Sequence, residues 1–165
     1  MYPVHDADAI LLLSLSLAAK RRPADLVEIC AAADLLQGVI PNPAKVSDAF
    51  ARLSAYGLIL EVNGGYTLNA DAQQMMEGMR KRDTIEQRIH MLKELLAEYH
   101  LQGEHVTLQV SDEALSAATL AHRAAQNSIA KNMLVPKPKP VEDPRKRPAK
   151  YQSFSAKRAA ARRKD

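Results

Sequence analysis

The pattern of apolar and polar positions divides the first part of the chain into three predicted helices and a β-hairpin. Leucines crowd the stretch from Asp6 to Lys20 too densely for one narrow face, so the first helix, capped by Asp6 or Asp8, is expected to be buried on most sides. The second helix is expected to begin at Pro23 and to end at Gly38. Its apolar residues recur at helical spacing and form one inward stripe, which consists of Leu26, Ile29, Cys30, Ala33 and Leu36.

The third helix is expected to run from residue 43 to residue 56. Asn42 can accept a hydrogen bond from the unpaired amides of the first turn, and Pro43 has no amide that needs a partner. Gly57 ends the helix, because glycine readily adopts the left-handed conformation that other residues avoid. One face of this helix is apolar and is expected to be buried. It consists of Val46, Phe50 and Leu53.

Two short strands are expected after this helix, over residues 58–62 and 66–68. Asn63 and Gly64 between them favour a tight hairpin turn. This series of three helices and a hairpin resembles the winged helix-turn-helix domain of MarR-like and PadR-like bacterial regulators, over residues 5–69. The resemblance implies a DNA-binding domain. Its third helix would enter the major groove, and its hairpin, the wing, would approach phosphates or the minor groove.

A helical extension is expected over residues 70–135. The stretch over about residues 71–100 is expected to be strongly helical, and its long helix 84–100 repeats apolar residues at the four-three spacing of a coiled coil. This seam consists of Ile85, Ile89, Leu92, Leu96 and Tyr99. Two interpretations are open. Either the seam packs against the chain's own winged domain, or it pairs with a second copy and forms a homodimer, as appended helices often do in the families that the chain resembles.

Shorter elements complete the extension. Alternating apolar residues from His105 to Val110 predict a short strand. A further helix is expected from Ser111, which can cap it, to about Met133. Its apolar face is small and should pack closely but weakly. That face consists of Leu115, Leu120 and alanines. The predicted fold is therefore mainly α.

The chain changes character at residue 136. Five of its nine prolines lie between 136 and 148, so residues 136–165 are expected to form an extended, disordered tail rather than part of the core. This tail holds 11 Lys and Arg against 3 Asp and Glu, a net charge of +8, whereas residues 1–135 hold 12 against 16, a net charge of −4. The basic character of the whole chain therefore belongs to the tail.

Candidate contacts with nucleic acid lie on the third helix and in the tail. Those on the helix are polar and expected to face outward, namely Lys45, Ser47, Asp48 and Arg52. Those in the tail are cations that can bind phosphates without reading bases, namely Lys146, Arg147, Lys150, Lys157, Arg158, Arg162, Arg163 and Lys164. Tyr151 and Phe154 can stack on single-stranded bases, so RNA is a candidate ligand beside DNA. Alternatively, the tail is a solubilising segment or contacts an anionic membrane surface.

Catalytic, metal and membrane functions find little support in the sequence. Cys30 is the only cysteine, which excludes an intramolecular disulfide and a multi-cysteine zinc site and fits a reducing compartment. The histidines are scattered without an HExxH motif, and no nucleotide-binding glycine-rich loop or GxSxG motif occurs. We therefore expect no enzyme, no metal and no cofactor.

The apolar run 9–19 has 11 residues, too few to span a bilayer, and follows acidic residues, unlike a secretory signal. A cytoplasmic protein is expected.

Two functions fit these observations. The first is a DNA-binding winged-helix protein, a transcriptional regulator, whose tail adds nonspecific affinity. The second is an interaction protein, whose winged domain binds another protein and whose tail tethers the assembly to nucleic acid or a ribonucleoprotein. The acidic residues 1–135, and a wing from Glu61 to Gly65 without Lys or Arg, favour the second, because phosphate contacts supply much of the affinity for DNA.

Overall fold

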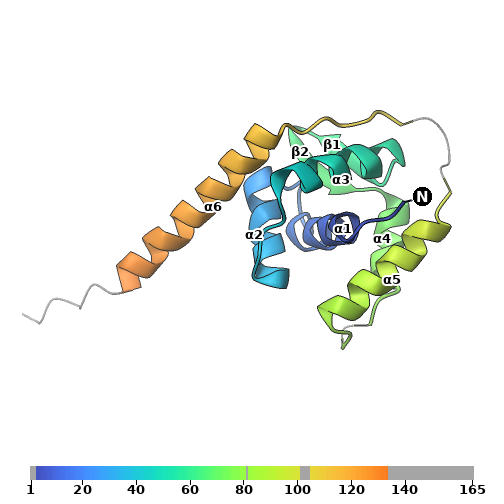
Figure 1. Ribbon diagram of the computed structural model, residues 1–165, viewed down its shortest axis with the longest axis horizontal. Coiled ribbons are helices and arrows are strands. Elements are labelled where there is room, and N and C mark those ends of the chain that lie inside the picture. Colours follow the sequence, from blue (N-terminus) through green and yellow to red (C-terminus); the bar gives the residue numbers. More distant parts are fainter. Residues whose placement is uncertain (1–2, 81, 101–104, 134–165) are drawn as a thin grey trace, which may run out of the picture. The chain divides into compact units, whose positions relative to one another are not determined.

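The computed structural model of the chain describes residues 3–80, 82–100 and 105–133, and only the backbone of 129–133. Within these ranges it contains six helices and one antiparallel two-stranded sheet (Figure 1). The predicted mainly α fold is confirmed, whereas the predicted tail lies outside the described residues. None of the helices in these ranges combines the length and the hydrophobicity that crossing a bilayer requires. The elements are α1 (Asp6–Ala18), α2 (Leu26–Gln37), α3 (Pro43–Ala55), β1 (Ile59–Val62), β2 (Gly65–Leu68), α4 (Ala70–Glu77), α5 (Ile85–Glu98) and α6 (Asp112–Met133).

Helix α1 is the centre of the core. It packs against α2, α3, α4, α5 and strand β2 (Figure 1). Every residue from Asp8 to Leu15 is buried, which confirms the prediction that this leucine-rich helix is covered on most sides. Its N-cap is His5 rather than Asp6 or Asp8. Asp8 occupies the third helical position, where its Oδ2 accepts a hydrogen bond from the His5 amide at 2.8 Å.

Helix α3 begins and ends at the residues that the sequence indicates. Oδ1 of Asn42 accepts a hydrogen bond from an amide of the first turn at 3.0 Å. At the other end Gly57 has a φ of +69°, and the Leu58 amide donates back to the Leu53 carbonyl at 2.9 Å. This pair of features is a glycine C-terminal motif that satisfies carbonyls of the last turn. Phe50 and Leu53 are fully buried, which confirms the predicted apolar stripe.

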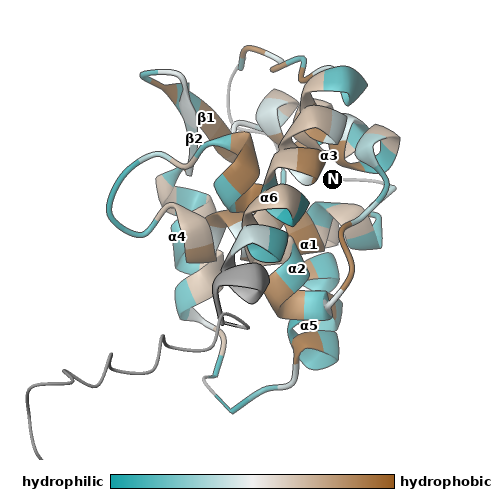
Figure 2. Ribbon diagram, turned by 90° about the vertical axis from the view of Figure 1, so that its left-hand side faces the viewer, coloured by the Kyte–Doolittle hydropathy of each residue, from teal (hydrophilic) through white to brown (hydrophobic). Residues whose placement is uncertain are grey.

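The hairpin also forms as predicted. Strands β1 and β2 pair antiparallel. Three of the four residues of β1 are hydrophobic (brown in Figure 2). Asn63 and Gly64 have φ values of 53° and 77°, the left-handed backbone that a tight hairpin turn requires. The ring of Tyr66 on β2 lies 5.0 Å from that of Phe50, measured between centroids, so the hairpin is anchored on α3.

Helix α2 begins later than the sequence predicts. Pro23 does not start it, because the backbone of Ala24 exchanges two hydrogen bonds with Tyr66, at 2.9 and 2.8 Å. Asp25 caps the helix instead, and its Oδ1 accepts a hydrogen bond from the Glu28 amide at 2.8 Å. The chain between α1 and α2 thus adds a single-residue bridge to the hairpin.

The stretch over about 71–100 is largely helical, as predicted, but it forms two helices, since α4 ends at Glu77 and α5 begins at Ile85. Each of these helices has its own cap. The Asn69 side chain accepts a hydrogen bond from the first turn of α4 at 2.8 Å. Thr84 and Gln87 form a reciprocal capping box at the start of α5. The capping residues therefore interrupt a stretch whose apolar spacing suggested continuity.

The strand predicted over 105–110 is also wrong, because this segment has no regular secondary structure. Helix α6 follows Ser111 as predicted, and Ser111 Oγ accepts a hydrogen bond from its first turn at 3.2 Å. Leu115 and Ala118 are buried. Leu120 is 65% exposed, contrary to the prediction, because it lies roughly 140° around the helix from Leu115.

Candidate functional site

Helix α3 exposes only a narrow surface. On its core-facing side Phe50 and Leu53 are fully buried and Val46 is partly buried, against α1 and the hairpin. Ala44, Lys45 and Asp48 are exposed, whereas Ser47 and Arg52 are only partly accessible. The surface that a recognition helix would offer is therefore smaller than the sequence indicates, and two features of the fold account for this.

The first feature is that residues 105–110 run along one flank of α3. Ser47 Oγ donates to the Val110 carbonyl at 2.6 Å, and the Leu108 amide donates to Ser54 Oγ at 2.8 Å. The ring of His105 lies against the end of the helix, since a Cβ added at Gly57 would sit 2.5 Å from its atoms. These hydrogen bonds join residues that are far apart in the sequence.

The second feature is the ion pair of Arg52. Its Nε and Nη2 donate to Oδ1 of Asp8 at 3.1 and 2.7 Å. The Asp8 side chain has no exposed surface, and that of Arg52 is 28% exposed. Because a buried carboxylate is costly without a counter-charge, Arg52 is committed to α1.

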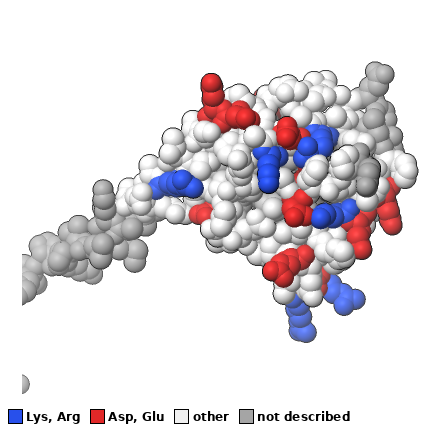
Figure 3. Space-filling view, viewed as in Figure 1, with Lys and Arg blue, Asp and Glu red and all other residues white. Residues whose placement is uncertain are grey.

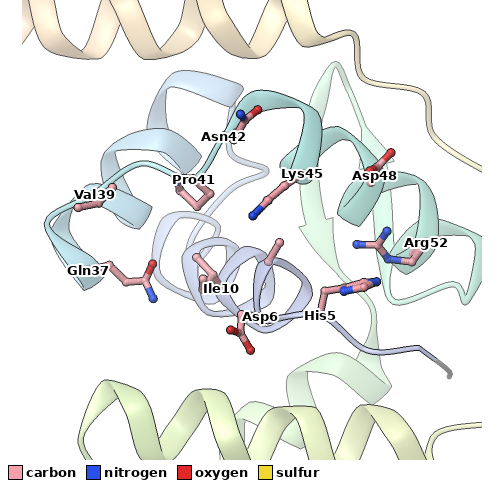
Figure 4. Close-up of a pocket in the computed structure, with 11 residues that line it drawn as sticks. His5, Asp6, Ile10, Gln37, Val39, Pro41, Asn42, Lys45, Asp48 and Arg52 are labelled. Carbon is pink, nitrogen blue, oxygen red and sulfur yellow. The ribbon is translucent and has the colours of Figure 1, made fainter.

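A cavity of about 480 Å³ opens beside α3 (Figure 4). It lies between the start of α1, the turn from α2 to α3, and α3 itself. Ile10 and Pro41 contribute apolar surface, and Lys45 points into it (Figure 4). Asp48 and Arg52 line it as well. Arg52 is paired with Asp8, whereas neither Lys45 nor Asp48 forms an ion pair with another described side chain.

The structure thus separates the four predicted residues of α3. Lys45, Asp48 and Arg52 share the cavity, whereas Ser47 lies on the other flank beneath Val110. The tail residues fall outside the described part of the chain, and their role stays a prediction. They are Lys146, Arg147, Lys150, Lys157, Arg158, Arg162, Arg163 and Lys164.

A polar cluster that the sequence analysis missed joins α6 to α2. His122 Nε2 lies 3.1 Å from Asp34 Oδ2, and Gln126 Nε2 lies 2.9 Å from the same oxygen and 3.0 Å from His122 Nε2. A protonated Nε2 donates to Asp34, whereas an unprotonated one accepts from Gln126. The sequence spacing could have indicated that His122 faces inward, because His122 follows Leu115 by seven residues and so lies on the same face of the helix.

Two ionisable groups between α2 and α6 are perturbed. Hydrogen bonds from His122 and Gln126 hold the pKa of the Asp34 carboxyl below its usual value. Burial raises the pKa of the Cys30 thiol, whose sulfur lies 3.7 Å from Thr119 Oγ1 on α6. Cys30 is buried, as predicted, and α6 covers it.

The predicted seam on α5 is partly used within the chain. Leu92 and Leu96 are fully buried in the core, where α5 packs on α1. Tyr99 donates its hydroxyl to Asp71 Oδ2 at 2.8 Å, and Ile85 and Ile89 are only half-buried. Burial and this hydrogen bond raise the pKa of Tyr99. Packing against the chain's own domain is thus observed for part of the seam, and a homodimer stays a prediction.

Charges of both signs are interspersed on the face shown in Figure 3. The hairpin tip carries the exposed Glu61 and no Lys or Arg. Among the described residues, no group of three or more His, Cys, Asp or Glu is arranged to hold a metal ion. Comparisons of the chain with protein-family models, curated proteins and solved structures found no match.

Proposed function

We propose that this chain is a cytoplasmic winged-helix DNA-binding protein that acts as a transcriptional regulator. The observation that carries the proposal is the order of its elements. A helix, a bridge at Ala24, two further helices and a paired hairpin follow one another, with α3 directly before the hairpin. This is the order in which winged helix-turn-helix domains present a recognition helix and a wing. The proposal rests on this fold-level analogy and on the chemistry of α3.

Base reading would fall to Lys45 and Asp48. Both are exposed on α3, one helical turn apart. In the major groove a lysine can donate to the O6 and N7 of guanine, and an aspartate can accept from the N4 amino group of cytosine. Arg52 and Ser47 have partners within the fold and are assigned supporting roles.

Attraction to DNA would come from the tail. Residues 1–135 carry a net charge of −4, and the hairpin tip lacks cations, so the body alone is a poor ligand for phosphates. If about six tail cations meet phosphates, the logarithm of affinity should fall with the logarithm of salt concentration with a slope of about −5. Such contacts hold the protein on DNA without selecting a sequence.

Selection of bound sequences from random DNA by the full chain tests the proposal. We expect one DNA sequence to be enriched. This enrichment should be lost in Lys45→Ala and Asp48→Ala and kept in Arg82→Ala. Arg82 is a suitable control, because it is exposed and lies far from α3 in the sequence. Recovery of unselected sequences only would overturn the regulator proposal.

A second function is favoured by exposed apolar residues. Leu35 and Val39, at and just after the end of α2, are 78% and 68% exposed. Val39 lines the cavity together with Ile10 and Pro41. Such a surface suits a protein partner, with the tail tethering the assembly to nucleic acid or a ribonucleoprotein. In that case the full chain selects no sequence, and the Lys45→Ala variant binds DNA as the unaltered chain does.

A further inference from the structure

Residues 105–126, here called the strap, are joined to the rest of the fold by a small contact. Their apolar part consists of the buried Val110, Leu115 and Ala118 and the partly buried Leu108. The polar part consists of the cluster of Asp34, His122 and Gln126 and of two hydrogen bonds to serines of α3. The side chains from Arg123 to Ser128 are exposed. Among the side chains described in α6, the contacts with the rest of the fold lie between Leu115 and Gln126.

The strap lies along one flank of α3, whereas Lys45 and Asp48 on the other flank stay exposed. Its first residues hold Ser47 and Ser54 on one flank of α3. The buried Leu115 lines a small apolar crevice between α1, α2 and α3, together with Cys30 and Val46. The major groove is about 12 Å wide and admits little more than one α-helix, so a segment bound along a flank of α3 would hinder its entry. DNA and the strap therefore compete for α3.

We infer that the strap is an autoinhibitory cover, which duplex DNA displaces from α3. This inference rests on the proposed function. With the strap docked, the tail can hold DNA but α3 cannot enter the major groove. With the strap released, the tail and α3 can bind the same duplex. A ligand shifts a conformational equilibrium only by its differential affinity for the two states, and the contacts of α3 provide that difference.

The same reasoning separates two polyanions. Heparin offers negative charge but no major groove, so it binds the tail equally well in both states and leaves the strap docked. A mixed-sequence DNA duplex favours the released state. The two probes therefore distinguish a cover on α3 from a simple response of the tail to negative charge.

The lone cysteine provides the measurement. Cys30 is buried beneath Thr119, so a thiol reagent reaches it when the strap leaves. His122→Ala and Leu115→Ala should each raise the labelling rate about tenfold, because each removes one part of a small contact. His90→Ala and Leu120→Ala are matched controls. His90 is an exposed partner of Glu94, and Leu120 is exposed on the same helix as Leu115.

Hydrogen exchange shows whether the fold survives these changes. Amides of α6 should exchange faster in His122→Ala and Leu115→Ala, whereas those of α1 keep their protection. If Cys30 is labelled at the unaltered rate in both variants, the inference that the strap is a releasable cover is wrong, even if the chain selects a DNA sequence. That outcome leaves the proposed function standing.

The ligand experiment uses the full chain. The duplex should raise the labelling rate of Cys30 about fivefold or more, and heparin should not. A duplex that binds without changing the rate overturns autoinhibition. Equal acceleration by heparin also overturns it, because the response would then follow from charge alone. If the variants label faster but no duplex binds, both the inferred displacement and the proposed function fail.

Discussion

Arg52 donates two hydrogen bonds, at 3.1 and 2.7 Å, to a single oxygen of Asp8, a carboxylate with no exposed surface. The other Asp8 oxygen accepts from the His5 amide. The carboxylate thus joins the start of α1 to α3. Withdrawing the arginine toward a phosphate would leave a buried charge uncompensated. Arg52 is therefore a structural residue first, although it lines the cavity on the exposed side of α3.

Arg52→Ala is expected to lower the free energy of unfolding by about 3 kcal/mol, because it leaves Asp8 buried without its partner. Urea denaturation measures this loss. Lys93→Ala is the matched control, since Lys93 Nζ also pairs with an aspartate of α1, Asp6, at 2.7 Å. That pair is exposed, and its removal should cost less than about 1 kcal/mol. Similar losses in the two variants would show that Arg52 contributes no more than a surface pair.

Features of the fold that depend on neighbouring residues could be predicted from the sequence. Asn42 caps α3, Gly57 ends it, and Asn63 with Gly64 turns the hairpin, because each acts through its own backbone or that of the next few residues. The apolar stripe around Phe50 followed from helical periodicity. These signals are local, so they need no knowledge of the rest of the chain.

Features that depend on distant residues could not. Ala24 forms a bridge with Tyr66 instead of joining α2. The partner of Arg52, Asp8, lies 44 positions away in the sequence. The sequence shows Arg52 as an outward-facing cation, and only tertiary packing reveals the carboxylate beneath it. The amide of Leu108 donates a hydrogen bond to a serine 54 residues earlier, so the segment predicted as a strand instead lies along α3. The candidate site was hardest to predict for this reason.

Substitution of two glycines separates backbone strain from crowding. Gly38 and Gly57 both have a φ of +69°, but a Cβ at Gly38 meets open space, whereas one at Gly57 meets the His105 ring. Gly38→Ala should cost about 1 kcal/mol of unfolding free energy, from the left-handed conformation alone. Gly57→Ala should cost more. Adding His105→Ala to Gly57→Ala should bring the loss toward that of Gly38→Ala, and thermal denaturation of the three proteins checks it.

Leu96→Ala tests what α5 packs against. Leu96 is fully buried within this chain, so its truncation should lower the free energy of unfolding by about 3 kcal/mol. The loss should be the same at low and high protein concentration. If the seam instead pairs two copies, the unfolding temperature rises with protein concentration, and the loss in the variant changes with it. Denaturation over a wide concentration range distinguishes the two.

Acid should release α6 from α2. The pKa of Asp34 is lowered in the docked state by hydrogen bonds from His122 and Gln126, so docking binds fewer protons than release. The contribution of Asp34 is therefore fully present above its ordinary pKa of 3.8 and is lost as the pH falls through the lowered value. Hydrogen exchange of the α6 amides measures the effect, after correction for the intrinsic pH dependence of exchange. In Asp34→Asn this side chain cannot ionise, so the acid-dependent part should disappear, and protection at neutral pH should already be reduced. A variant that keeps the full acid response would assign the titration to another group.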